Sequence, residues 1–227
     1  MESGGKSPAN PELKEGDVFY VMHDGSYQVY KMLAHDSAVS CYHVLVYESV
    51  TVRPSAETAG HLEVSIYHVP IDAEGFRDPV VMANAPVLAR ELVGYHEYIR
   101  QTRHYEDYTQ LAMDYFNDGL RLTDENRHRD AIDAYSKAAD LFPLFYEALD
   151  NRAFCKMDLA LWEEAIEDFY LSLQVYPESV LAEFSIGECY LRLKRYPEAK
   201  AQFEKVLAID PDHQLSRDFM ENVKALL

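Results

Sequence analysis

Apolar residues change their spacing near residue 86, and this change divides the chain into two parts. Before that point they mostly alternate with polar residues, which is the pattern of strands with one buried face. The run over residues 39–47 is almost continuously apolar or aromatic, as expected of a strand inside a sheet. The predicted strands cover residues 18–23, 27–33, 39–47, 50–52 and 62–69. We expect four or five antiparallel strands, closed into a small barrel or bent into a strongly curved sheet.

Turn-forming residues separate the predicted strands. Asp24 and Gly25 lie between the first two runs, and a two-residue hairpin favours this pair because both of its central residues need a positive φ. Pro70 is expected to end the last strand, since it has no N–H to donate to a neighbouring strand. Residues 73–79 contain a glycine and a proline and are expected to form a loop.

From Pro86 onward, apolar residues recur every three or four positions, which predicts a helix with one apolar face. This apolar stripe consists of Val87, Leu88, Leu92, Tyr95 and Ile99. We expect a joining helix over residues 85–105. It follows a small β domain over residues 15–84 and a flexible N-terminus over residues 1–14.

The rest of the chain repeats itself at a fixed interval. Three kinds of residue share this interval, and they are small, aromatic and proline. They are Ala131, Ala165 and Ala199; Tyr135, Phe169 and Phe203; and Pro143, Pro177 and Pro211. Small residues at Gly119, Ala153 and Gly187 let two helices approach closely, and each proline ends the second helix of a pair. The aromatic residues are expected to fill the space towards the next pair.

A 34-residue unit with a small residue, an aromatic residue and a closing proline resembles the tetratricopeptide repeat family. The resemblance covers residues 106–227. It implies a superhelix of three repeats, over residues 112–145, 146–179 and 180–213, followed by a C-terminal capping helix. The second repeat departs from the family pattern at Lys156, where an aromatic residue is usual. The expected fold class is α+β, with a small antiparallel β domain followed by an all-α repeat.

In this family the first helices of successive pairs line a concave groove that receives a partner peptide. The resemblance places ten residues in that groove. They are Met113, Phe116, Leu120, Glu147, Asp150, Asn151, Phe154, Leu181, Phe184 and Glu188. Because this lining is apolar with acidic neighbours, we expect a protein or peptide partner with an amphipathic or basic segment. Three other occupants stay open: the joining helix, the β domain and a second copy of the chain in a homodimer.

Family members that grip the C-terminal carboxylate of chaperones use five polar residues. These are a lysine and an asparagine on the first helix, an asparagine on the next, and a lysine and an arginine on the third. The matching positions hold Phe116 and Leu120, then Asn151, then Leu181 and Ser185. Only Asn151 agrees, so we do not expect a carboxylate clamp.

The chain has 227 residues, with 39 acidic and 21 basic side chains and a formal net charge of −18. So acidic a molecule repels phosphate groups, and we expect neither nucleic acid nor a membrane as a partner. No apolar run approaches the roughly 20 residues that span a bilayer, and the first ten residues lack the apolar stretch of a secretory signal. Cys41, Cys155 and Cys189 are far apart, which predicts reduced thiols and a cytoplasmic location.

Residues able to do chemistry are present, but few patterns join them. No two histidines have the HxH or HxxxH spacing of a metal site, so we expect neither a metal nor another cofactor. The best candidate pair is His43 and His68, on the same predicted sheet. The chain has no GxSxG, P-loop or GxGxxG motif, and we do not expect an enzyme. Four clustered carboxylates are expected on a solvated helix face: Glu163, Glu164, Glu167 and Asp168.

Residues 16–19 (Gly-Asp-Val-Phe) resemble the opening strand of small bacterial β domains, some of which belong to immunity proteins that neutralise toxins. This resemblance implies one alternative, an immunity-type inhibitor that binds a basic toxin through the β domain. An enzyme with a site between the two halves, around His43 and His68, is another. Residues 105–227 carry 25 acidic and 13 basic side chains, against 14 and 8 in residues 1–104. The greater negative charge favours the repeats as the surface that attracts a basic partner. The leading expectation is a non-catalytic adaptor or scaffold that binds a peptide or partner helix in the groove.

Overall fold

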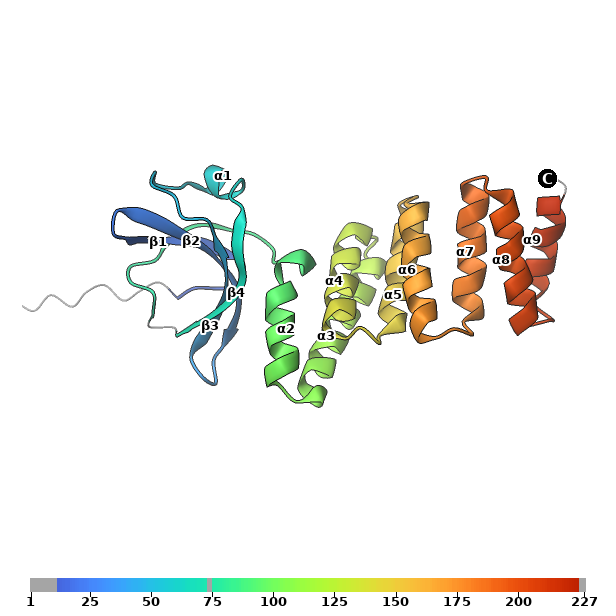
Figure 1. Cartoon of the computed structure of the whole chain (residues 1–227), viewed down its shortest axis with the longest axis horizontal. Coiled ribbons are helices and arrows are strands. Elements are labelled where there is room, and N and C mark those ends of the chain that lie inside the picture. The colour runs from blue at the N-terminus through green and yellow to red at the C-terminus, as the bar shows by residue number, and fades with distance from the viewer. Residues whose placement is uncertain (1–11, 73–74, 225–227) are drawn as a thin grey trace, which may run out of the picture. The chain divides into compact units, whose positions relative to one another are not determined.

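The computed structural model describes residues 12–72 and 75–224, and it divides the chain into two compact units, Met1–Thr102 and Arg103–Leu227. The first unit is built on a β-sheet and the second consists of helices (Figure 1). Most of the terminus that was predicted to be flexible lies outside the described residues. Leu13, at its end, is only 3% exposed and belongs to the core of the sheet unit, so the prediction was wrong for this residue.

The sheet has five antiparallel strands in the order β4-β3-β2-β1-β5. Their bounds are β1 Asp17–His23, β2 Ser26–Asp36, β3 Cys41–Tyr47, β4 Val64–Asp72 and β5 Val80–Asn84. Three of the four strand pairings contain a bulge or register shift, and such irregularities bend strands and increase their twist. The sheet is open, with β4 and β5 at its edges. The α+β fold class is therefore confirmed. Of the two predicted forms of the sheet, the closed barrel was wrong.

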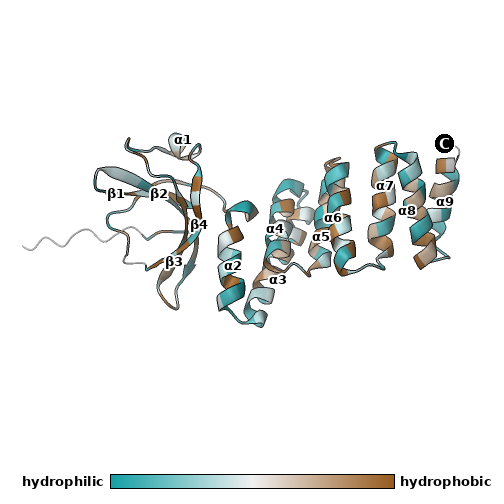
Figure 2. Ribbon diagram, in the orientation of Figure 1, coloured by the Kyte–Doolittle hydropathy of each residue, from teal (hydrophilic) through white to brown (hydrophobic). Residues whose placement is uncertain are grey.

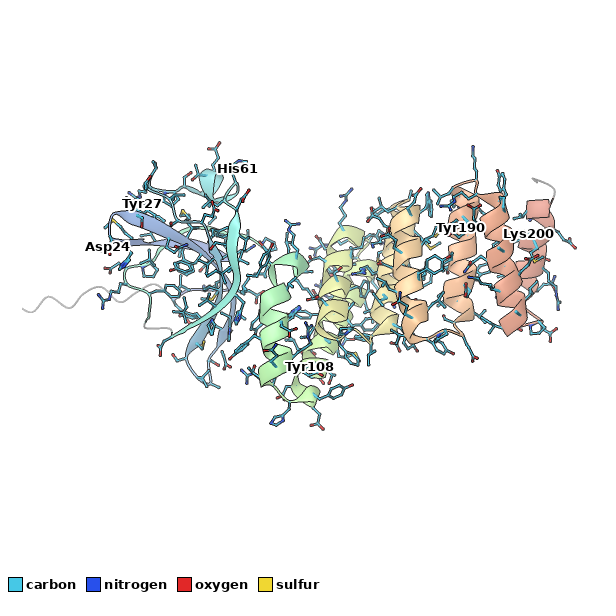
Figure 3. The ribbon with its side chains drawn as sticks, in the orientation of Figure 1. Asp24, Tyr27, His61, Tyr108, Tyr190 and Lys200 are labelled. Atoms are coloured by element: carbon cyan, nitrogen blue, oxygen red, sulfur yellow. The ribbon has the colours of Figure 1, made fainter. Side chains whose placement is uncertain are left out.

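Asp24 and Gly25 form the predicted hairpin turn, with φ angles of 47° and 81°. Asp24 lies at the tip of this hairpin (Figure 3). Two other predictions were wrong. Residues 50–52 form only an isolated bridge, and the fifth strand is instead β5. Pro70 lies inside β4, which an edge strand permits because its missing N–H can face away from the sheet.

Both faces of the sheet are buried. One face packs around Phe19, Met32 and Val44, and it is closed by Phe76 from the loop before β5. The opposite face packs around Val29 and Leu45, together with residues from α1 (Ala56–Ala59) and from the segment before α2 (Val93–Thr102). This double burial explains why β3 is apolar along its whole length.

The joining helix predicted over residues 85–105 is not continuous. A short 3-10 helix, η2 (Ala89–Glu91), comes first, and α2 begins at Val93. Helix α2 contacts β4 and approaches it through Gly94, where an added Cβ would lie 2.9 Å from the Cβ of His68. The next helix, α3, begins separately at Tyr105.

The described part of the helical unit, residues 103–224, contains three antiparallel helix pairs and a last helix. The pairs are α3 (Tyr105–Asp124) with α4 (His128–Leu141), α5 (Tyr146–Asp158) with α6 (Trp162–Val175), and α7 (Val180–Arg192) with α8 (Tyr196–Ile209); α9 (Gln214–Lys224) follows. Apolar and polar segments alternate along these helices (Figure 2), as expected when one face of each is buried. Helix α9 packs Phe219 against Phe203 of α8, with ring centroids 5.5 Å apart.

The glycines of the repeat leave space for the aromatic ring of the same helix pair. A Cβ added at Gly119 would lie 2.5 Å from Cε1 of Tyr135, and one added at Gly187 would lie 2.5 Å from Cε1 of Phe203. The predicted close approach is therefore observed in the first and third pairs, which carry these glycines. The aromatic rings also pack towards the next helices, as expected, since Tyr135 shares a core cluster with Cys155 of α5 and Phe203 stacks on Phe219 of α9.

The same kind of turn joins the two helices of each pair. The φ angle is positive at Asn126, Ala160 and Lys194, which occupy the same position in the three repeats. At each turn, the N–H of the following residue donates to a carbonyl five residues back, as in Arg127 to Leu122 at 2.9 Å. This is the Schellman arrangement, which satisfies the last carbonyls of the first helix.

Candidate functional site

The ten residues predicted to line a groove lie on the first helices of the three pairs, and we call their surface the first-helix face. It comprises Met113, Phe116 and Leu120 on α3; Glu147, Asp150, Asn151 and Phe154 on α5; and Leu181, Phe184 and Glu188 on α7. The 34-residue period relates these positions to one another. Phe116, Asp150 and Phe184 occupy equivalent places, and so do Leu120, Phe154 and Glu188.

Three apolar side chains of the first-helix face are exposed. Met113 is 42% exposed, Leu120 39% and Leu181 53%. Large apolar side chains exposed on one face often mark a contact surface. These three side chains are therefore available to a partner.

The three phenylalanines are only partly available, because each packs on an aromatic ring of its own pair. The centroid distances are 5.7 Å from Phe116 to Tyr135, 5.3 Å from Phe154 to Phe169 and 5.5 Å from Phe184 to Phe203. Helix α9 covers one of them further, because Phe219 lies 5.6 Å from Phe184. Sequence reasoning placed these residues in a groove without showing that they also belong to the core.

Asp150 is a buried carboxyl in the middle of the first-helix face. It is 5% exposed, and its Oδ1 has no hydrogen-bond partner among the described residues. Burial raises the pKa of this carboxyl; the Ser172 hydroxyl lowers it, and Glu147 raises it further. The equivalent positions hold Phe116 and Phe184, so only the middle pair carries an acid here.

Two further carboxylates lie on the same face. Glu147 is exposed at the start of α5, and Glu188 is half-buried on α7. Burial raises the pKa of the Glu188 carboxyl, and Arg192 on the next turn partly lowers it. The ten residues include three acids and no base, so a cationic group would be attracted to this face.

A polar network on α5 and α6 was not found from the sequence. Arg152 donates to both carboxylate oxygens of Asp168, at 2.8 and 2.6 Å, and Nζ of Lys156 lies 2.7 Å from Oδ2 of the same carboxylate. Asp168 is only 2% exposed, so the expected solvated face was wrong for this residue, although Glu163, Glu164 and Glu167 are exposed. The network also explains Lys156, whose charge replaces the usual aromatic residue. The sequence signal for this network was the presence of a base, Lys156, on the first helix and an acid, Asp168, on the second helix of the same pair.

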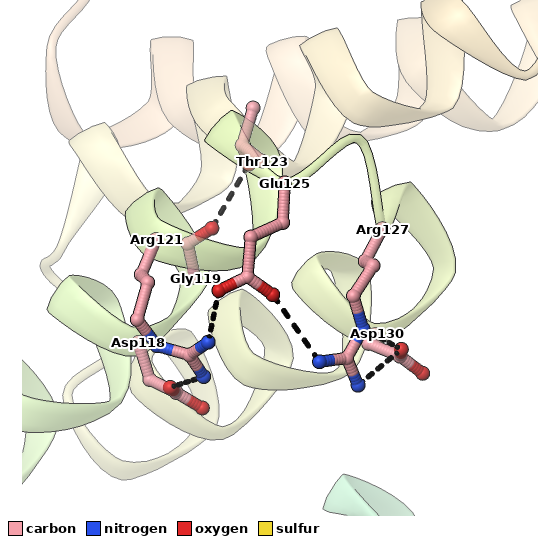
Figure 4. A network of polar contacts seen from close by, with 7 residues as sticks. All are labelled: Asp118, Gly119, Arg121, Thr123, Glu125, Arg127 and Asp130. Atoms are coloured by element: carbon pink, nitrogen blue, oxygen red, sulfur yellow. Dashed lines mark hydrogen bonds and ion pairs between the residues drawn. The ribbon is translucent and has the colours of Figure 1, made fainter.

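A second network surrounds the turn between α3 and α4 (Figure 4). Glu125 accepts from both Arg121 and Arg127, and each arginine also binds an aspartate, Asp118 or Asp130. All five side chains are exposed, and such pairs are strongly screened by water. We interpret this network as a set of surface ion pairs around the turn and not as a reactive group.

The structure brings His43 and His68 together in the sheet unit. Nδ1 of His43 lies 2.9 Å from Nε2 of His68, on the neighbouring strands β3 and β4. Burial and the neighbouring His43 lower the pKa of His68 to about 4. The rings of Tyr95 and Tyr98 on α2 pack against both imidazoles. The two histidines share a hydrogen bond inside an aromatic cluster.

The described residues contain no group of three or more His, Cys, Asp or Glu side chains that could hold a metal ion. None of their helices is both long and apolar enough to cross a membrane. Cys155 and Cys189 are buried and free, as expected of small core residues.

Comparisons with known proteins concern the repeats. A model of the tetratricopeptide repeat family matches residues 180–213. Human sperm-associated antigen 1 is 26% identical over 110 residues, which is 48% of this chain and 12% of that protein. The E3 ubiquitin-protein ligase CHIP of Arabidopsis thaliana is 30% identical over 90 residues, which is 40% of this chain and 32% of that protein. The chain thus spans a third or less of these relatives.

Two solved structures share the helical fold. The first TPR of Spaghetti (RPAP3), bound to the HSP90 peptide SRMEEVD, has a TM-score of 0.50 at 23% identity, and the match covers 52% of this chain and 94% of that one. The Arabidopsis OM64 TPR domain has a TM-score of 0.50 at 19% identity, covering 53% and 99%. The family match over residues 180–213, the 34-residue period and the three helix pairs support a tetratricopeptide repeat assignment for the helical unit, and the two solved structures share its helical fold.

Proposed function

We propose that this protein is a non-catalytic adaptor, and that its first-helix face binds a peptide segment or helix of a partner protein. The observation that carries the proposal is the composition of this face. It presents three exposed apolar side chains, Met113, Leu120 and Leu181, beside the accessible carboxylates of Glu147 and Glu188, with the buried Asp150 beneath them and no base among its ten residues. Similar helical units are known in complex with peptides, as the RPAP3 structure with an HSP90 peptide illustrates.

The charge of the first-helix face selects the partner. Asp150 and Glu188 are carboxyls whose pKa burial raises, so their charged forms are short of stabilising partners. A lysine or arginine from a bound segment would supply that charge, while apolar side chains of the segment cover Met113 and Leu181. The segment we propose is therefore basic and amphipathic.

An acidic tail such as SRMEEVD does not suit this face. The 34-residue period places the equivalents of Phe116 and Leu120 at Asp150 and Phe154, then at Phe184 and Glu188. The positions matched to the carboxylate clamp of the family on the second and third helices were different ones, Asn151, Leu181 and Ser185. Neither set contains a lysine or arginine, so we propose that the protein does not bind as a carboxylate clamp.

Selection from a random displayed heptapeptide library tests both parts of the proposal. The intact chain should enrich peptides that combine lysine or arginine with large apolar residues. A Glu147→Lys, Glu188→Lys variant should lose at least about tenfold in affinity for those peptides, because it replaces attraction by repulsion. The matched control is Glu163→Lys, Glu167→Lys, which changes the same charge on exposed positions of α6.

The outcomes separate the claims. If acidic peptides are enriched instead, the proposed charge preference is wrong although the adaptor stands. If both variants lose binding equally, the peptides respond to net charge and not to the first-helix face. If no peptide is enriched, the peptide-binding function itself is overturned.

The three cysteines are free, and we propose a cytoplasmic location on that basis. No specific feature of the described part of the sheet unit favours the immunity-type inhibitor, and the His43–His68 pair is hydrogen bonded to itself rather than aimed at a substrate. We therefore advance neither of these alternatives.

A further inference from the structure

The sheet unit contains a pocket of about 360 Å³ that the proposed function does not use. Every residue that lines it belongs to this unit, from strands β1 to β5, helix α1 and the η2 segment. Its volume lies at the lower end of the range of about 300–1,000 Å³ typical of small-molecule sites. The pocket thus has room for one small ligand.

Small apolar side chains form the walls of the pocket. They are Ala56, Ala59, Leu62, Val64, Ala83 and Ala85. Alanines leave space where larger residues would fill it, and the apolar surface that they expose favours an apolar body. The walls therefore accept the hydrocarbon part of a ligand.

A largely buried ion pair between Lys31 and Glu91 also lines the pocket. Lys31 is 4% exposed and lies on the sheet face that also buries Val29 and Leu33. Its Nζ donates to both oxygens of Glu91, at 3.0 and 2.8 Å, and to the carbonyl of Pro86 at 2.8 Å. Glu91 also accepts from the N–H of Leu88. The charges of Lys31 and Glu91 are thus already satisfied by each other and by the backbone.

Two further donors line the pocket beside this pair, the guanidinium of the exposed Arg90 and the hydroxyl of the half-buried Tyr47. Neither side chain makes a hydrogen bond to another described residue, so both can turn to a ligand. Tyr47, Arg90 and Glu91 all line the pocket. Burial and Glu91 raise the pKa of Tyr47 to about 12, while Arg90 lowers it, so the phenol keeps its proton and can donate it to a ligand. The lining carries two bases, Lys31 and Arg90, and one acid, Glu91, in a chain whose net charge is −18. This local excess of positive charge favours an anion.

We propose that this pocket binds a small amphipathic anion. Its single carboxylate or phosphate group takes hydrogen bonds from the Arg90 guanidinium and the Tyr47 hydroxyl, and its short hydrocarbon part lies on the alanine-rich walls. Arg90 would repel a cation, and a neutral alcohol would form no charge-assisted hydrogen bond with its guanidinium. The inference concerns the sheet unit and is independent of the peptide-binding function proposed above.

Titrations of the intact chain with four probes of equal chain length test this proposal. The probes are hexanoate, hexyl phosphate, hexanol and hexylamine, and amide chemical shifts in the NMR spectrum report binding. The two anions should produce saturable shifts at Tyr47, Arg90 and Glu91, whereas hexanol should bind much more weakly and hexylamine not at all. The tighter of the two anions identifies the head group.

Two variants localise the binding, and a third serves as control. Arg90→Gln should weaken hexanoate or hexyl phosphate by about tenfold or more, because a charge-assisted hydrogen bond is lost. Arg77→Gln changes an exposed arginine of the same unit outside this pocket and should leave the affinity unchanged. Ala56→Phe at the exposed start of α1 should block the anions by filling the space without changing the charge.

Three results would overturn the proposal. Equal binding of hexanol and hexanoate would show that no anion is recognised. Equal weakening by Arg90→Gln and Arg77→Gln would show a diffuse effect of charge. Shifts that never saturate would show that the pocket takes no ligand of this class.

Discussion

Asp168 receives two cations from the neighbouring helix, and this arrangement governs what a single substitution can do. Its carboxylate is 3% exposed, whereas Arg152 and Lys156 are 17% and 13% exposed, so all three charges are largely removed from water. Buried charges cost free energy unless they are paired, and loss of one partner leaves the others uncompensated. Arg152 also donates to the Ser136 hydroxyl on α4, which joins the second pair to the first.

Asp168→Asn should lower the free energy of unfolding by about 3 kcal/mol, since it leaves two buried cations without their anion. Urea titration followed by the fluorescence of Trp162, on the same helix, measures this loss. Glu167→Gln changes the exposed neighbour and should shift the value by less than about 0.5 kcal/mol. A similar small shift for both variants would mean that the network contributes nothing to stability.

At the scale of the element, the turns inside the helix pairs place a non-glycine residue in the left-handed region. Ala160 has a φ of 59° and Lys194 a φ of 58°. For an L-residue with a Cβ this conformation costs about 1–2 kcal/mol, and glycine avoids the cost. The stabilisation of the turns by their hydrogen bonds outweighs that cost.

Ala160→Gly should therefore raise the free energy of unfolding by about 0.5–1 kcal/mol, after allowing for the greater freedom of glycine in the unfolded chain. Ala201→Gly, at an exposed interior position of α8, should lower it by about 1 kcal/mol. Chemical denaturation of both variants provides the comparison. Losses of the same size in both would show that the turn at Ala160 is not strained.

The sequence reveals an element where its signal is local and repeated. The helix pairs follow from columns such as Ala131, Ala165 and Ala199, because the same packing recurs once in every repeat. Strand β5 was missed, since five residues between loops carry too little periodicity to stand out. Pro70 was misread, because its tolerance depends on β4 lying at an edge, which only the assembled sheet decides.

The same distinction applies to the candidate site. The register of the repeat placed its ten residues on the first helices, but burial depends on the partners across each pair. Phe184 is held by Phe203 and Phe219, and neither contact follows from the spacing alone. The proximity of His43 and His68 was expected only as far as both were assigned to one sheet.

At the scale of the whole molecule, the two units have separate cores and should respond separately to solution conditions. The His43–His68 cluster belongs to the sheet unit, whereas Trp162, the only tryptophan of the chain, belongs to the helical unit. Probes of the two units can therefore be read independently.

Acid should destabilise the sheet unit through His68. Its pKa is about 4 in the folded protein and 6.5 in an unperturbed histidine, so the unfolded state binds the proton first as the pH falls. The stabilisation is complete above about pH 6.5 and is lost between pH 6.5 and about 4. After discounting for partial exposure, the loss amounts to about 2 kcal/mol. Hydrogen exchange of amides in β3 and β4, measured across this range, tests it.

The matching control is His61→Gln, which replaces an exposed histidine of the same unit and should preserve the pH dependence. His68→Phe should flatten it. An unchanged pH dependence in His68→Phe would assign the acid sensitivity to other groups, and a parallel response of Trp162 fluorescence would show that the two units unfold together.

The left-handed residues at Asn126, Ala160 and Lys194 reverse the chain at the same point of every pair. Each pair therefore begins and ends in the same relation to its neighbours, and a gain or loss of one whole repeat preserves the path of all the helices that follow. Gene duplication or deletion in steps of this size can lengthen or shorten the binding face while the sheet unit stays intact. The length of the binding face can therefore change by whole repeats.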